Sequence, residues 1–196
     1  MADIIDQLVG IQPGTKLDGI RAQRQQARDN AQASYLALFQ PDSLADMSLS
    51  ERHAVAVFVC VLHGKPDIAA FYAEDLGAEA RMIEVEAALA ITTGPYGKYP
   101  EGVLSAEDVA GPPYTPGHAA ALGPRLAAAL AHAHLLVFHP RDAAPEALQA
   151  LIDAGWSTTG IVTLSQLISF LSFQIRVVVG LRALGASSDP KGSPVG

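Results

Sequence analysis

The sequence predicts an all-α protein, and three observations lead to this prediction. Alanine and leucine are abundant, and apolar residues recur at intervals of three and four along most of the chain, which is the spacing of one helix face. Segments that alternate apolar and polar residues, as half-buried strands do, are nearly absent. Proline, glycine and capping residues stand at the ends of the predicted helices.

The composition limits the classes of protein to which this chain can belong. Its 196 residues are 49% hydrophobic and 17% charged, which excludes intrinsic disorder over most of the chain. The net charge of -7 argues against a nucleic-acid partner, because nothing supplies a basic surface for phosphates. A single cysteine excludes an intrachain disulfide and a zinc site built from cysteines. So much apolar surface with so few charges predicts a homo-oligomer.

The first long helix is expected over residues 16–39, and Pro41 ends it. Three arginines recur on one face of this segment, namely Arg21, Arg24 and Arg28. We interpret them as a solvent-exposed face balanced by Asp18 and Asp29, with an anion or partner site as the alternative.

The second helix is expected to begin at a capping box, in which Ser48 is the N-cap and Glu51 is the third helical residue. It runs to about His63, and Gly64 suits the position just after its end. The residues between are apolar on nearly all sides, which predicts a fully buried helix.

Two further helices are expected over residues 66–76 and 79–91. The segment 92–123 differs from both, because it holds five prolines and six glycines. We interpret it as a long crossover between two helical halves, at about 16–91 and 124–185, that acts as a lid, a binding loop or an arm onto a neighbouring subunit.

Three helices are expected in the second half, over residues 124–137, 145–154 and 159–184. The last of them is apolar on two faces, so we expect it to pack both in its own subunit and against another copy. A charge placed at Leu171 or Phe173 is therefore expected to dissociate or unfold the protein. The tail, residues 186–196, is predicted to be disordered.

No export signal or membrane span is predicted. The N-terminus begins acidic and lacks the basic and long apolar regions of a signal peptide. Residues 154–175 carry no charge, but nine serine, threonine and glutamine side chains interrupt them, which favours a buried helix over a membrane span. We expect a cytoplasmic protein without a membrane partner.

Two segments carry a resemblance to a known family. They read SLSERHAVAVFVCVLHGKPDIAAFYAEDL and LAAALAHAHLLVFHPRDAAPEALQALIDAGWSTTGIVTLSQLISFLSFQIRVVVGLRAL. With them the chain resembles the carboxymuconolactone decarboxylase and alkylhydroperoxidase D-like superfamily, in particular its two-part, peroxidase-related members. The resemblance covers roughly residues 16–185. It implies one all-α domain over residues 1–185, built from antiparallel helix pairs, in an obligate dimer, trimer or hexamer.

The peroxidatic motif of that family does not match in place. Its two cysteines fall at Lys65 and Ile68, its histidine falls at Tyr72, and its glutamate falls near His53. Thiol chemistry needs one thiolate to attack the peroxide and a second thiol to resolve the sulfenic acid, and neither Lys65 nor Ile68 can do this. The resemblance therefore implies the fold and the assembly more strongly than peroxidase activity.

Seven residues are candidates for a site that binds or transforms a small molecule. His53, Lys65 and Tyr72 would occupy the family's pocket as an acid–base set, with Glu51 nearby. The alternative is that all three are structural, with Lys65 solvated, Tyr72 packed against its neighbours and His53 buried in the core. Candidate substrate-binding residues lie on the last helix, namely Phe170, Gln174 and Arg176. Arg176 is expected to be buried and to need a carboxylate, from Glu51, Glu84, Glu86 or a ligand.

The remaining reactive residues are expected to be structural, so neither a metal nor a cofactor is predicted. Cys60 lies in the apolar helix and is more typical of an inert core residue than of a reactive thiol. His132 and His134 are two residues apart and point to opposite sides of a helix, so they cannot chelate one metal. Asp142 is expected to cap the helix that begins near residue 145, or to pair with Arg141.

Three hypotheses for function follow. The first is an oligomeric enzyme of the superfamily that works on a small organic acid by acid–base or lyase-like chemistry without the cysteine pair. The second is a peroxide-linked, antioxidant role through Cys60 or through a partner that carries the complete motif. The third is an oligomeric binding protein without catalytic activity.

Overall fold

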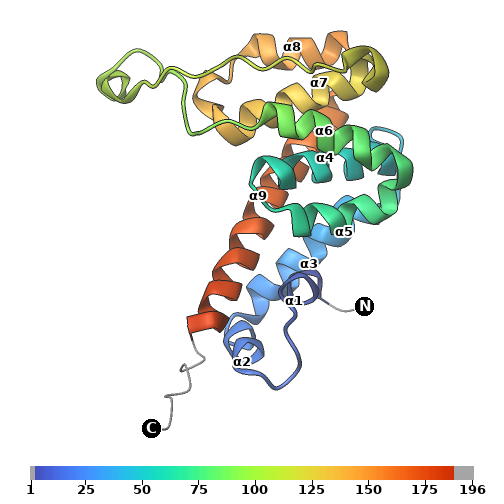
Figure 1. Ribbon diagram of the computed structural model, residues 1–196, viewed down its shortest axis with the longest axis vertical. Coiled ribbons are helices and arrows are strands. Elements are labelled where there is room, and N and C mark those ends of the chain that lie inside the picture. The colour runs from blue at the N-terminus through green and yellow to red at the C-terminus, as the bar shows by residue number, and fades with distance from the viewer. Residues whose placement is uncertain (1–2, 188–196) are drawn as a thin grey trace, which may run out of the picture.

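The protein is all-α, as predicted. The computed structural model describes residues 3–187, and the only strand-like pairing in that range is one isolated bridge between Gly97 and Val109 (Figure 1). The predicted disordered tail lies outside the described residues from position 188 onward. The last helix itself continues to Ser187, three residues past the predicted end at 184.

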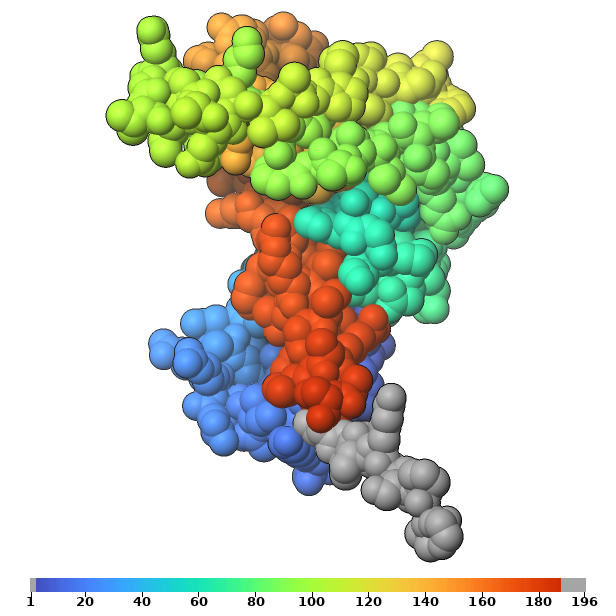
Figure 2. All heavy atoms as spheres, turned by 60° about the vertical axis from the view of Figure 1, so that its left-hand side comes forward, coloured from blue at the N-terminus to red at the C-terminus, as the bar shows by residue number. Residues whose placement is uncertain are grey.

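Two groups of helices are joined by one long helix (Figure 1). The N-terminal group contains α1 (Ile4–Val9), α2 (Lys16–Ala22) and α3 (Gln25–Phe39). The other group contains α4 (Leu49–Leu62), α5 (Pro66–Leu76), α6 (Ala80–Ala90), α7 (Ala119–Phe138) and α8 (Pro145–Asp153). Helix α9 (Thr158–Ser187) packs against α4, α7 and α8 in its first half and reaches α1 and α3. The molecule narrows where α9 passes between the two groups (Figure 2).

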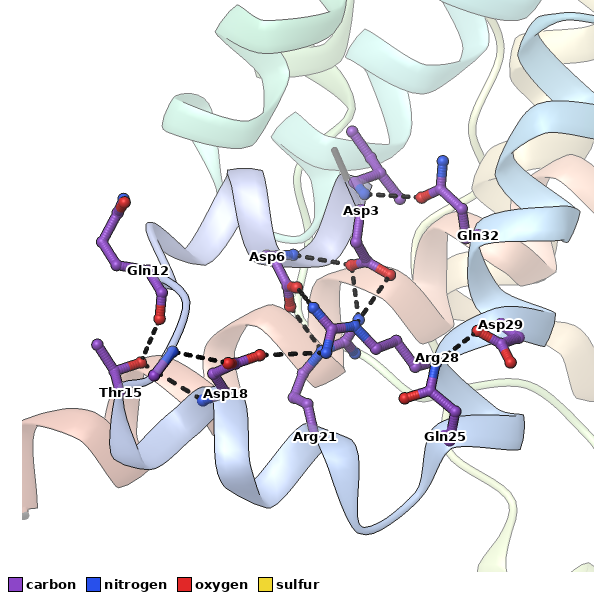
Figure 3. A network of polar contacts seen from close by, with 12 residues as sticks. Asp3, Asp6, Gln12, Thr15, Asp18, Arg21, Gln25, Arg28, Asp29 and Gln32 are labelled. Carbon is purple, nitrogen blue, oxygen red and sulfur yellow. Dashed lines mark hydrogen bonds and ion pairs between the residues drawn. The ribbon is translucent and has the colours of Figure 1, made fainter. Parts of the chain in front are cut away.

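The prediction of one helix over residues 16–39 is wrong. The segment forms two helices, because the backbone at Arg24 leaves the helical conformation (φ -125°, ψ 53°). Helix α1, which was not predicted, supplies the reason. Asp3 at the start of α1 and Asp6 within it form ion pairs with Arg21 on α2 and Arg28 on α3 (Figure 3). One straight helix over residues 16–39 would not place both arginines beside these two aspartates.

The ion pairs at this point form a network rather than a solvent-exposed face. Arg21 Nη2 lies 2.6 Å from Asp3 Oδ1, and Arg21 Nε lies 2.7 Å from Asp6 Oδ1. Arg28 pairs with Asp6 and lies 3.1 Å from Asp18 Oδ1. The expected pairing with Asp18 is thus confirmed for Arg28. Two partly buried arginines and three aspartates here hold α1, α2 and α3 together.

The first half of the large group follows the predictions. Ser48 and Glu51 form the capping box, with Glu51 Oε2 2.8 Å from the Ser48 backbone nitrogen. Helix α4 is buried on nearly every side, as its uninterrupted apolar sequence requires. Gly64 takes the left-handed conformation (φ +66°) after the helix end, and Pro66 begins α5.

The crossover is held to the large group by one buried carboxylate. Glu86 on α6 is fully buried and accepts hydrogen bonds from the Tyr114 hydroxyl (2.8 Å) and from the backbone nitrogens of Gly117 (2.8 Å) and His118 (3.0 Å). It also lies 2.6 Å from Nδ1 of His118. These bonds lower the pKa of Glu86 against the opposing effect of burial, which is the largest single influence. Helix α7 begins directly after them at Ala119, but Gly123 is non-helical (φ +76°, ψ 159°) and divides it, so that a helical segment starts at Pro124 as predicted.

Arg125 connects the two halves of the large group. Its Nε lies 2.5 Å from Glu51 Oε1, and its other two nitrogens donate to the backbone oxygens of Gly155 (2.7 Å) and Asp46 (2.6 Å). The guanidinium stacks on the Trp156 ring at 3.9 Å. Glu51 is therefore a structural residue that caps α4 and anchors α7.

The prediction that Asp142 caps α8 or pairs with Arg141 is wrong. Ala144 occupies the N-cap position of α8. Asp142 instead accepts a hydrogen bond from the backbone nitrogen of Lys98 (2.8 Å) and lies 3.2 Å from Nδ1 of His139. Its side chain is thus used to hold the crossover, which local sequence does not reveal.

The predicted inner face of α9 is confirmed, because all six of its residues are buried: Ile161, Leu164, Ile168, Leu171, Ile175 and Val178. On the second predicted face Phe170 is buried, but Val162 and Phe173 are 56% and 46% exposed in the single chain. Two helices of the described part, α7 and α9, are long and apolar enough to cross a membrane, a property that core helices share.

Candidate functional site

The structure does not bring His53, Lys65 and Tyr72 to one cavity. Tyr72 is fully buried, and its hydroxyl donates to Gln174 Oε1 at 2.7 Å. Burial raises the pKa of Tyr72 well above its ordinary value, so the phenol stays protonated. The Phe39 ring packs against the rings of His53 and Tyr72, and its centroid lies 5.2 Å and 4.9 Å from theirs. Lys65 lies at the N-cap of α5, partly exposed.

His53 faces a different surface from the other predicted residues. Its Nδ1 lies 3.2 Å from the backbone oxygen of Tyr72 and 3.7 Å from Oδ2 of Asp75. The ring lines a hollow of about 500 Å³ with Ser50 and Glu79. Two carboxylates beside one histidine make this hollow acidic, which disfavours an organic acid as its ligand.

Gln174 is fully buried between α5 and α9. It accepts the hydrogen bond from Tyr72, while its amide nitrogen has no hydrogen-bond partner within the described part of the chain. This pair lies inside the core, so it links α5 to α9 by a buried hydrogen bond rather than facing a ligand.

The expectation that Arg176 is buried and paired with a glutamate is wrong. Its side chain is exposed, and its one hydrogen bond goes to the backbone oxygen of Ser172 (3.2 Å). The three glutamates considered are engaged elsewhere, by Arg125, Arg81 and His118. Arg176 thus has no carboxylate partner among residues 3–187.

Arg176 lines a hollow of about 340 Å³ beside the end of α4, which we call the His63 hollow. Its polar lining consists of His63, Ser169, Ser172 and Arg176, and its apolar lining consists of Leu136, Val137, Pro140 and Ile168. Nε2 of His63 lies 3.2 Å from the Ser172 hydroxyl. Burial and the nearby Arg176 charge lower the pKa of His63, so its imidazole is neutral at pH 7.

This hollow combines a cation, a neutral imidazole and two hydroxyls. A guanidinium without a carboxylate partner can hold a carboxylate, and a neutral imidazole can accept a proton from a group bound next to it. Sequence reasoning missed His63 as a site residue. The available signal was its place at the end of the buried helix, two residues before Lys65.

A groove of about 950 Å³ lies along the first half of α9, and we call it the α9 groove. Its lining includes Phe170, Val162 and Leu148, together with the buried Arg52. Arg52 donates to the backbone oxygens of Leu38 (2.6 Å) and Met47 (3.0 Å). Phe170 therefore lines this groove and not the His63 hollow.

Cys60 is fully buried, and burial raises the pKa of its thiol far above the ordinary value. We expect the native protein to react with a thiol reagent such as Ellman's reagent at least 100-fold more slowly than the unfolded protein in denaturant, because both access and thiolate are lacking. Rapid reaction of the native protein would contradict this expectation.

His132 and His134 face different partners, as predicted. His132 Nε2 lies 3.0 Å from the Ser165 hydroxyl, and His134 Nδ1 lies 3.1 Å from Nε2 of His139. Residues 3–187 hold no group of three or more histidine, cysteine, aspartate or glutamate side chains arranged to bind a metal.

His134 predicts a loss of stability in mild acid. Its Nε2 lies 3.2 Å from the Ala90 carbonyl oxygen, which can only accept, so Nε2 carries the proton. Burial, and then the charge of His139, lower the pKa of His134 to about 4. Between pH 7 and pH 5 the unfolded chain binds a proton that the folded chain does not, which costs about 2 kcal/mol of unfolding free energy.

Urea unfolding at pH 7 and pH 5 measures this effect. The variant His134→Phe keeps a ring against Tyr114, which stacks on His134 with centroids 4.5 Å apart. We expect the variant to lose about 2 kcal/mol less than the wild type between these two pH values. Equal losses in the two proteins would remove His134 as the cause.

Comparison with protein-family models, with curated proteins and with solved structures finds no match for this chain.

Proposed function

We propose that this chain is a subunit of a homo-oligomer that binds a small organic carboxylate in the His63 hollow and moves a proton on it by acid–base chemistry. The observation that carries the proposal is the position of Arg176, which lines the hollow beside a neutral histidine and pairs with no carboxylate in the described part of the chain. In a protein with a net charge of -7, such a cation favours an anionic ligand.

Each polar residue of the hollow has a role in this proposal. Arg176 binds the carboxylate with two parallel N–H donors. His63 accepts a proton from the carbon next to the carboxylate, for which its lowered pKa keeps it in the basic form. Ser172 holds the ring through the contact at Nε2. The superfamily that the sequence resembles includes a decarboxylase branch, whose chemistry needs no thiol.

The two other hypotheses receive less support. A peroxide-linked role needs a reactive thiol, whereas Cys60 is fully buried with a raised pKa. That role is then restricted to a partner that carries the complete motif. A binding protein without catalytic activity would keep the carboxylate site and lack only the proton transfer, so a test of both steps separates it from the proposal.

The proposed assembly rests on the α9 groove. Residues 158–175 carry no charge, although Val162 is more than half exposed and Leu148 on the opposite wall is 46% exposed. Depletion of charge over an apolar patch is typical of the centre of a protein interface. The charged residues that line the groove are Asp46 and the buried Arg52, one of each sign, and closed symmetric assemblies of identical chains are common.

Succinate, acetate and benzoate serve as probes of the carboxylate site. We expect isothermal titration calorimetry to show binding of at least one of them, and we expect Arg176→Gln to weaken that binding at least tenfold because the cation is removed. Arg81→Gln is the matched control, because Arg81 is an exposed arginine on α6 that does not line the hollow. Equal binding by wild type and Arg176→Gln would refute the site.

The second step is tested by hydrogen exchange on the bound acid. In deuterated buffer, NMR of succinate is expected to show that the wild type replaces carbon-bound hydrogen by deuterium, and that His63→Gln abolishes this exchange while it leaves binding largely intact. Binding without any exchange by the wild type would reject the catalytic part and favour a binding protein.

A further inference from the structure

A second hollow lies at the other end of α9, where the N-terminal helices pack on it, and we call it the N-terminal hollow. It measures about 400 Å³. Most of its lining is apolar, with Ile5, Ile20, Ala27, Ala31, Phe173, Val177 and Leu181. Phe173 is 46% exposed there, so a large aromatic surface stays in contact with water in the single chain. The N-terminal hollow shares no lining residue with the His63 hollow.

All charged residues that line this hollow are cationic. They are Arg21, Arg24 and Arg28, and Gln23 is the remaining polar lining residue. The aspartates that neutralise Arg21 and Arg28 lie in the network between α1, α2 and α3 and do not line the hollow (Figure 3). Arg24 is exposed and forms no ion pair with the described residues.

The break between α2 and α3 explains why Arg24 differs from its neighbours. Arg21 and Arg28 form ion pairs with aspartates of α1 and α2. The backbone at Arg24 is non-helical, so Arg24 does not share the helix face on which the other two arginines lie. One uncompensated guanidinium therefore stands at the edge of an apolar hollow. A ligand that fits both features has one negative head and one apolar body.

We propose that the N-terminal hollow binds an unesterified medium-chain fatty acid in its ionised form, with its carboxylate on Arg24 and its hydrocarbon chain on Phe173, Val177 and Leu181. Covering Phe173 removes apolar surface from water, which favours binding of a hydrocarbon chain. A phosphate or a nucleotide fits less well, because only one of the three guanidiniums is unpaired and the rest of the lining is apolar.

The probe is decanoate, below its micelle concentration, titrated calorimetrically into the full chain, with decan-1-ol as the uncharged analogue. We expect decanoate to bind and decan-1-ol to bind at least tenfold more weakly. Arg24→Gln should weaken decanoate binding at least tenfold, because it removes the charge but no contact that holds the fold. Arg176→Gln and Arg81→Gln should leave decanoate binding unchanged.

The variants distinguish binding in the N-terminal hollow, which Arg24 lines, from binding in the His63 hollow, which Arg176 lines. Loss of decanoate binding in Arg176→Gln, with retention in Arg24→Gln, would assign the ligand to the His63 hollow and overturn the inference. Equal binding of decanoate by wild type and Arg24→Gln would also overturn it, as would equal binding of decan-1-ol. A change of molecular mass in Arg24→Gln, measured by light scattering, would assign the hollow to a contact between copies and overturn the inference as well.

Discussion

Replacing Glu86 by leucine is expected to lower the free energy of unfolding by about 1–3 kcal/mol, because the change removes a buried carboxylate that accepts hydrogen bonds from the crossover. The variant leaves the Tyr114 hydroxyl and the backbone N–H groups of Gly117 and His118 without an acceptor. Tyr114 is half-buried, and its unpaired hydroxyl costs about 1–3 kcal/mol, whereas Gly117 and His118 are exposed and their N–H groups can turn to water. Chemical denaturation at pH 7 measures the loss.

Glu84→Leu is the matched control for this prediction. Glu84 lies on the same helix, two residues earlier, but its side chain is 38% exposed and its only ion pair is a surface contact of 3.6 Å with Arg81. Such a pair contributes about 0–1 kcal/mol, so the control is expected to stay close to the wild type. Similar stabilities of Glu86→Leu and Glu84→Leu would contradict the anchoring role.

Local hydrogen exchange distinguishes anchoring from a general loss of stability. If Glu86 holds the crossover, the backbone amides of Gly117 and His118 exchange much faster in Glu86→Leu than in the wild type. The exchange rates of amides in the centre of α4 then change only as much as the global free energy of unfolding predicts. Uniform acceleration over all helices would mean that the carboxylate supports the whole core instead.

Local sequence signals predicted the elements whose boundaries are set by their own residues. The capping box at Ser48 and Glu51, the stop at Gly64 and the start at Pro66 all act within one or two turns of chain, and each is confirmed. The same holds for the buried face of α9, which follows from spacing alone.

Contacts between distant segments were not predictable in this way. The break at Arg24 depends on Asp3 and Asp6, which belong to a helix of only six residues that gives a weak periodic signal. The position of Asp142 likewise depends on Lys98 in the crossover. Spacing along one segment does not show which distant partner a charged side chain will reach.

The sequence named only part of the lining of the His63 hollow. Arg176, expected as a substrate-binding residue, lines this hollow, whereas His53, Lys65 and Tyr72, expected as an acid–base set, do not, and His63 was not named. The helical spacing gave the buried side of α9 correctly. It did not show that the Arg176 side chain is exposed, because the burial of a charged residue depends on which helices pack beside it.

The second large effect is expected for Leu171→Asp, which should unfold the protein. Leu171 is fully buried on the inner face of α9, and a carboxylate there has no partner. The cost of several kcal/mol is comparable with the whole stability of a marginally stable domain. Circular dichroism at 25 °C is expected to show loss of most helical signal, and a cooperative thermal transition at the wild-type temperature would contradict the burial.

Val162→Asp, nine residues earlier on the same helix, separates folding from assembly. Val162 is 56% exposed in the single chain and lines the α9 groove, so a carboxylate there stays solvated and the helical signal is expected to remain. If copies of the chain cover the groove, the same carboxylate becomes buried at each contact, and light scattering is expected to show the mass of a single chain for the variant and a multiple of it for the wild type. A variant that keeps the wild-type mass would remove the groove as the contact surface, because an interface centre does not accept an unpaired charge.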